Sequence, residues 1–199
     1  MRKRQGIAVV AFAALAMMFS GGVGAIDSRG AVRAANVWTK FHPGDDIRND
    51  IRASRVQIAD LDRDGVDEVV YLLTATCIGA SFDCTNDVVV MTPLRKGDPR
   101  LRPGRLDNDY MTDLWRRAEQ SGYGDDTSLH VPGDVRALAI VGDRVQVTFD
   151  VVRDSPICKR SLDRGSAGPC PEPGRYRWTL SWREGALSKT REILLGRDD

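Results

Sequence analysis

The chain has 199 residues, with 29 Lys or Arg against 28 Asp or Glu, so its formal net charge is +1. This balance argues against a general polyanion binder, because such proteins carry a large excess of positive charge. The length suits a single domain with a sizeable hydrophobic core.

The first 25 residues have the organisation of a secretory signal peptide. Three basic residues precede an apolar run over residues 7–18, and Val23 and Ala25 supply the small side chains that a signal peptidase needs before its cut. The run is shorter than the roughly 20 residues of a membrane-spanning helix, which disfavours the alternative of a membrane anchor. We therefore expect a secreted or periplasmic domain of residues 26–199, with a net charge of −2 and no membrane span.

The first half of this domain predicts two helices and three strands. Apolar residues recur at helical intervals over residues 27–41 and again over residues 107–120. His42-Pro43-Gly44 ends the first of these segments, and a basic connector rich in Pro and Gly, residues 93–104, precedes the second. The predicted strands are residues 56–58, 69–74 and 87–92.

The second half has the two-residue periodicity of antiparallel strands. The predicted strands are residues 135–141, 144–152, 175–183 and 186–194. Gly142-Asp143 is a two-residue hairpin signal between the first two. Tyr176, Trp178 and Trp182 share one strand face, and we expect them to pack in the core against the second helix rather than to form a sugar-stacking platform. The sequence thus predicts one α+β domain, mostly antiparallel β, with one or two helices packed on the sheet.

All four cysteines, Cys77, Cys84, Cys158 and Cys170, lie beyond the predicted cleavage site. An even number in an oxidising compartment indicates two disulfides, and three pairings are possible. We favour Cys77–Cys84 and Cys158–Cys170, because each pair brackets a turn-rich segment between two predicted strands. A zinc site is the alternative, but neither spacing is Cys-x-x-Cys and no His is nearby in the sequence.

The segment Asp60–Glu68, with the sequence DLDRDGVDE, places five carboxylates directly before a predicted strand. Calcium takes about six to eight oxygen ligands, and carboxylates at alternate loop positions can converge on one ion. Gly65 stands where such a loop must turn sharply, and Asp67 falls between ligand positions. The predicted ligands are the carboxylates of Asp60, Asp62, Asp64 and Glu68 and the backbone carbonyl of Val66. The alternative is a solvated acidic turn stabilised by Arg55 or Arg63.

The form D-x-D-x-D-G-x-x-[DE] between two strands resembles the calcium loops of FG-GAP and VCBS-type repeats. The resemblance covers residues 56–73, and a single copy does not build the propeller that such repeats usually form. The pattern is not an EF-hand, because its twelfth position is Tyr71 rather than a bidentate Glu. Residues 60–92 also resemble a segment that is found in a group of small exported bacterial proteins. That resemblance implies no enzymatic reaction. We expect any bound calcium to be structural, because it would cancel carboxylate repulsion and fix the turn.

The sequence contains no G-x-S-x-G, no H-E-x-x-H and no phosphate-cradling glycine-rich loop. His42 and His130 are not at a metal-ligand spacing from each other. We therefore predict no enzyme but a monomeric, calcium-stabilised interaction module that binds another protein or an envelope component. An extracytoplasmic hydrolase or carbohydrate-binding protein is the alternative. The basic segment Arg95–Arg105 lacks aromatic residues for base stacking, which favours a solvated connector over a nucleic-acid site.

Overall fold

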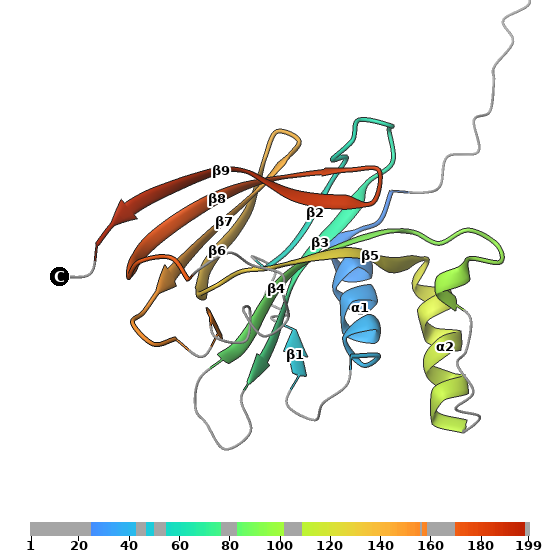
Figure 1. The fold of residues 1–199 in the computed structure, drawn as a ribbon. Coiled ribbons are helices and arrows are strands. Elements are labelled where there is room, and N and C mark those ends of the chain that lie inside the picture. Colours follow the sequence, from blue (N-terminus) through green and yellow to red (C-terminus); the bar gives the residue numbers. More distant parts are fainter. Residues whose placement is uncertain are drawn as a thin grey trace, which may run out of the picture.

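The computed structural model describes residues 25–42, 47–49, 55–76, 83–101, 109–155, 157–158 and 170–197. Within these residues it contains two antiparallel sheets and two α-helices (Figure 1), which confirms the predicted α+β fold with mostly β structure. The predicted signal peptide lies outside the described residues except for Ala25. None of the helices described is long and apolar enough to cross a membrane.

The first sheet forms the middle layer of the fold. Its strands are β1 (Ile47–Asn49), β2 (Val56–Ala59), β3 (Glu68–Thr76), β4 (Asp83–Pro93) and β5 (Tyr123–His130). The order is β1-β3-β4-β5, and β2 pairs with β3 beyond the end of β1. In β3, Val70 and Leu72 face one hydrophobic cluster, whereas Tyr71 and Leu73 face another. Both faces of this sheet are therefore buried, which explains why β3 and β4 carry continuous apolar runs.

The second sheet covers one face of the first. Its strands are β6 (Asp134–Val141), β7 (Arg144–Val151), β8 (Gly174–Arg183) and β9 (Ala186–Gly196), in the order β6-β7-β8-β9. Gly142, with a φ of 64°, makes the predicted two-residue turn between β6 and β7. Alternate residues of β7 and β8, among them Phe149 and Trp178, pack with Val70 and Leu72 in the core between the sheets.

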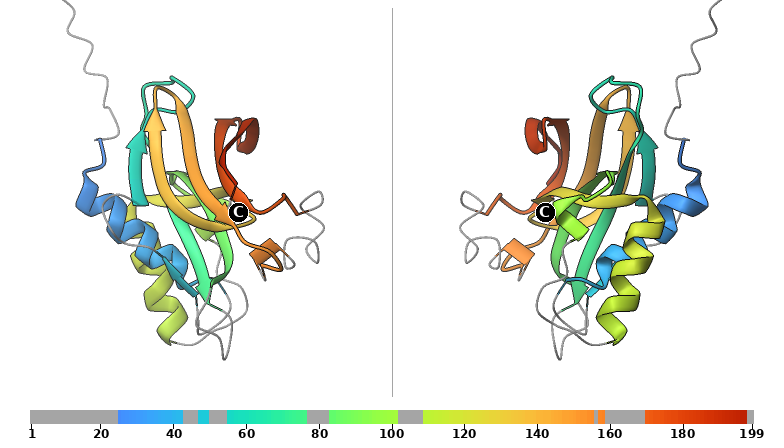
Figure 2. Two further views of the ribbon diagram at one scale, coloured as in Figure 1. Left: turned by 90° about the vertical axis from the view of Figure 1, so that its left-hand side faces the viewer. Right: turned by 90° about the vertical axis from the view of Figure 1, so that its right-hand side faces the viewer.

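The helices cover the opposite face of the first sheet, as the two side views in Figure 2 show. They are α1 (Ser28–Thr39), α2 (Asp109–Ser121) and the short 3-10 helix η2 (Pro99–Leu101). Asp27 caps α1, because its carboxylate accepts a hydrogen bond from the Gly30 N–H at 2.6 Å. Trp38 of α1 meets Trp115 of α2 edge to face, with 6.3 Å between the ring centroids.

The structure corrects two sequence-based expectations. Tyr176, Trp178 and Trp182 are buried, as predicted, but they do not pack against the second helix. Trp115 of that helix instead contacts Trp38 and Phe41, on the other side of the first sheet. The second correction is β5, a strand that was not predicted. Its polar sequence YGDDTSLH follows from its position at one end of the sheet order, where few of its side chains are buried.

The structure contains the predicted disulfide between Cys158 and Cys170. Cys158 is buried and Cys170 is exposed, and the bond ties the segment after β7 to the segment that enters β8. Cys77 lies outside the described residues, so the Cys77–Cys84 pair stays a prediction.

Candidate metal centre

The acidic segment is the loop of the β2–β3 hairpin. The register pairs Ala59 with Glu68, so residues 60–67 connect the two strands. Leu61 is 2% exposed and anchors the loop in the core between the sheets. Gly65 has a φ of 86°, in the left-handed region that glycine adopts without strain. Burial of Leu61 and the turn at Gly65 thus hold the alternating aspartates on a short, closed loop.

The loop backbone wraps its own carboxylates. Asp60 accepts hydrogen bonds from the N–H groups of Asp64 and Gly65, at 3.1 and 3.0 Å. Asp62 accepts from the Asp64 N–H at 3.2 Å, and Asp64 accepts from the Val66 N–H at 2.8 Å. These bonds fix the rotamers of the aspartates and offset part of their mutual repulsion, because N–H dipoles point toward the negative charges.

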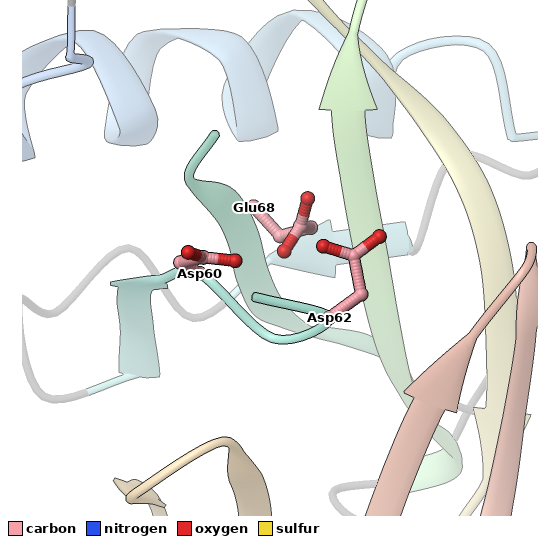
Figure 3. A group of neighbouring side chains, drawn as sticks. All are labelled: Asp60, Asp62 and Glu68. Carbon is pink, nitrogen blue, oxygen red and sulfur yellow. The ribbon is translucent and has the colours of Figure 1, made fainter. Parts of the chain in front are cut away.

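Three carboxylates of the hairpin converge on one point. One oxygen from each of Asp60, Asp62 and Glu68 lies within 4.8 Å of the others (Figure 3). Asp62 is exposed, Asp60 is half-buried, and Glu68 is 2% exposed. The group therefore runs from the surface of the loop to its base, where β3 begins.

Glu68 is the unusual member of this group. Its Oε2 accepts a hydrogen bond from the Leu61 N–H at 2.7 Å, which favours the ionised form. Burial has the larger effect and, with the negative charges of Asp62, Asp64 and Asp60, raises the pKa of Glu68 to about 7. Glu68 is thus about half protonated at neutral pH, and a cation shared with Asp60 and Asp62 would favour its ionised form.

The loop opens on a hollow of about 770 Å³, which Asp62, Asp64, Val66 and Glu68 line together with residues of β5 and of the segment after β4. In its lining, the Arg100 guanidinium bonds to both oxygens of Asp98 and holds the pKa of that carboxyl well below its usual range. Most of the charged residues that line the hollow are acidic.

Asp125 of β5 also lines the hollow. Its carboxylate accepts a hydrogen bond from the buried Tyr71 hydroxyl at 3.1 Å and lies 3.2 Å from Nε2 of His42. Neighbouring Asp126 accepts a hydrogen bond from Nε1 of Trp182 at 3.2 Å. The side chains of these two aspartates are therefore held in place by His42 after α1 and by residues of β3 and β8.

The structure places all five predicted ligand residues on one loop, but only three form the convergent group. Asp64 and Val66 lie beside that group and line the hollow. Arg63, one of two arginines considered for a metal-free turn, pairs with Asp143 of the β6–β7 turn at 3.2 Å. Its ion pair ties the tip of the loop to the second sheet.

The basic segment Arg95–Arg105 is described only as far as Leu101. Within it, Arg100 donates to the backbone carbonyls of Gly124 and Pro93 as well as to Asp98. Sequence reasoning assigned this arginine to a solvated connector, whereas it bonds to the end of β4 and the start of β5. No sequence signal distinguishes it from its basic neighbours.

Comparison with known proteins adds no assignment: no protein-family model, curated protein or solved structure matches this chain. The likeness of the β2–β3 loop to FG-GAP and VCBS-type calcium loops therefore stays a prediction from its residues.

Proposed function

We propose that this chain is an exported, monomeric interaction module stabilised by one calcium ion at the β2–β3 loop. Asp60, Asp62 and Glu68 would bind the ion, and Asp64 and the Val66 carbonyl would complete its oxygen ligands. The observation that carries the proposal is the convergence of three carboxylates at a buried Glu68. The Cys158–Cys170 disulfide supports an oxidising compartment, and hence export.

Calcium fits this donor set better than other common ions. The loop offers carboxylate and carbonyl oxygens, which hard cations prefer, and neither His nor Cys stands in the loop. Magnesium demands a near-ideal octahedron, whereas calcium accepts the irregular arrangement of a loop. The ion would have a structural role, because it would join the loop to the base of β3 and neutralise Glu68. The partner would then bind elsewhere on the stabilised surface.

One observation favours the alternative function, an extracytoplasmic hydrolase or carbohydrate-binding protein. The hollow beside the loop contains Asp125 and Asp126 as well as the loop carboxylates, and a concave site with convergent polar groups is typical of ligand binding. Hydrolysis or binding of an oligosaccharide that is lost in Asp126→Asn would establish this alternative. The absence of both across a glycan panel would leave the interaction module.

Thermal unfolding with calcium tests the metal site. If the dissociation constant is about 0.1 mM, 10 mM calcium adds about 2.7 kcal/mol to the unfolding free energy. For a domain of this size that is a rise in Tm of roughly 5–10 °C. Asp62→Ala should abolish the rise, because it removes a convergent carboxylate.

Asp67→Ala is the matched control, since it removes one negative charge from the same loop at a non-ligand position. Its backbone carbonyl, which accepts a hydrogen bond from the Tyr123 hydroxyl, stays in place. This variant should keep most of the calcium-dependent rise. Equal stabilisation by magnesium, or an equal loss in both variants, would mean that screening of charge and not a calcium site explains the effect.

A further inference from the structure

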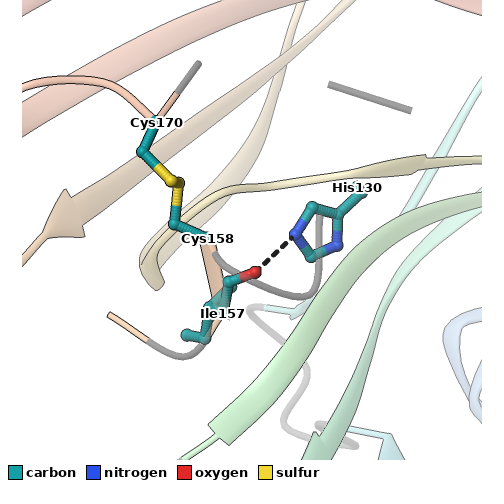
Figure 4. Close-up of a disulfide and its surroundings, with 4 residues drawn as sticks. All are labelled: His130, Ile157, Cys158 and Cys170. Carbon is teal, nitrogen blue, oxygen red and sulfur yellow. Dashed lines mark hydrogen bonds between the residues drawn. A yellow bond between two sulfur atoms is a disulfide. The ribbon is translucent and has the colours of Figure 1, made fainter. Parts of the chain in front are cut away.

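His130 contacts a hydrogen-bond acceptor at each of its two ring nitrogens. Nδ1 lies 2.9 Å from Oδ1 of Asp87, its partner across the β4–β5 pairing. Nε2 lies 3.3 Å from the backbone carbonyl oxygen of Ile157, the residue before disulfide-bonded Cys158 (Figure 4). The side chains of His130 and Asp87 are 9% and 13% exposed, so water replaces few of these contacts.

The two acceptors impose a requirement on protons. An ionised carboxylate and a carbonyl oxygen accept hydrogen bonds but do not donate them, and a neutral imidazole has one N–H. With neutral His130 and ionised Asp87, one of the two contacts would bring lone pairs together. Both contacts become hydrogen bonds when the pair holds one additional proton, whether it resides on His130 or on Asp87.

We propose that His130 and Asp87 form a proton-dependent clamp that holds the Ile157–Cys158 segment against the first sheet. Protonation closes the clamp, and loss of the proton breaks the contact between Nε2 and the Ile157 carbonyl. The closed clamp holds one proton more than the open one, so acid favours closing and base favours opening.

The clamp has consequences for the second sheet because Cys158 is bonded to Cys170. The chain of contacts runs from β5 through His130, Ile157 and the disulfide to the segment that enters β8. Residues 151–155 and 170–173 with Cys158 also line a hollow of about 400 Å³. Opening the clamp would release Ile157, the neighbour of Cys158 in the lining of that hollow, while the disulfide still ties Cys158 to Cys170.

His130 and Asp87 together carry this behaviour, because the additional proton can reside on either of them. From the described neighbouring segments, Arg153, Asp154 and Glu172 also line the hollow, and all three are exposed to solvent. Among the described residues, the hydrogen bonds of the His130 ring go to Asp87 and Ile157. Burial, with smaller effects of Asp125 and Asp87, raises the pKa of Tyr71, so this hydroxyl stays protonated from pH 5 to 9. The pH response is therefore assigned to the His130–Asp87 pair.

An NMR titration of the disulfide-bonded mature protein from pH 5 to 9 tests the clamp. The two ring nitrogens of His130 and the carbonyl carbon of Ile157 are followed together. In the wild type, the Ile157 signal should move with the same midpoint as the ring. In His130→Gln, whose amide does not change protonation, the Ile157 signal should not titrate over this range.

The Asp87→Asn variant tests whether the contact with the Ile157 carbonyl depends on a proton shared with Asp87. The Asn amide can donate to Nδ1, so a neutral His130 keeps its proton on Nε2 for the Ile157 carbonyl. The Ile157 signal should then stay near the closed position at every pH. The proposal is overturned if this variant titrates like the wild type, if the wild-type Ile157 signal does not follow the ring, or if the ring keeps one protonation state throughout. Should His130→Gln not fold, the other two proteins decide.

Discussion

Glu68 should make the stability of the calcium-free protein depend on pH. Its pKa is raised from 4.5 to about 7 in the folded state, chiefly because the carboxyl group is buried. A raised folded-state pKa means that the folded protein binds the proton more tightly than the unfolded chain does. The resulting stabilisation is fully present below pH 4.5 and is lost as the pH rises through about 7.

The size of the effect follows from the two pKa values. They differ by about 2.5, which corresponds to on the order of 3 kcal/mol of unfolding free energy. Glu68→Gln keeps an oxygen for the Leu61 N–H but cannot ionise. In a chelator, this variant should match the wild type near pH 4.5 and exceed it by as much as this amount at pH 8. Urea unfolding, followed by tryptophan fluorescence, measures the difference at each pH.

At pH 8, 10 mM calcium should remove most of this difference, because the bound ion adds about 2.7 kcal/mol to the wild type and binds the variant weakly. The reasoning is refuted if wild type and Glu68→Gln follow parallel pH profiles in chelator. Groups other than Glu68 also titrate in this range, but they are common to both proteins and cancel in the difference.

Three further predictions concern the disulfide and the second sheet. Replacing Cys158 and Cys170 together by Ser should lower the unfolding free energy by about 3 kcal/mol in urea titrations. The reason is that the disulfide closes a loop with a sequence separation of 12, and its loss raises the conformational entropy of the unfolded chain. Gly133→Ala should cost about 3 kcal/mol in the same assay, since its Cβ would stand 2.3 Å from the Asp150 carbonyl oxygen. Asp150→Asn should cost about 2 kcal/mol at pH 7, because two arginines lower the pKa of this carboxyl. That loss should shrink as the pH falls through the lowered pKa, where the wild-type carboxylate is protonated too.

Much of the strand arrangement could be predicted from local sequence. The apolar runs of β3 and β4 and the alternation of β8 each indicated a strand, because burial on one or two faces leaves its period in the residues. β5 escaped prediction since it lies at one end of the sheet order, where polar residues such as Asp125 and Asp126 are accommodated. The error over the packing partner of Trp182 has a related cause. Periodicity shows which face of a strand is buried but not which layer covers it.

The same limit applies to the functional residues. The spacing of Asp60, Asp62 and Glu68 suggested their convergence because they share one short loop, where sequence distance bounds spatial distance. Contacts between distant segments left no such signal. The pairing of His130 with Asp87 depends on the β4–β5 register, and its contact with Ile157 depends on how the disulfide segment folds back.

Isothermal titration calorimetry at pH 7 measures calcium binding to the β2–β3 loop directly. We expect one ion per chain, with a dissociation constant on the order of 0.1–1 mM. Because the pKa of Glu68 is raised to about 7, binding should release about half a proton, which appears as a heat that varies with the ionisation enthalpy of the buffer. Asp62→Ala should abolish binding and Asp67→Ala should retain it. Absence of binding in the wild type, or unchanged binding in Asp62→Ala, would contradict the proposed calcium site.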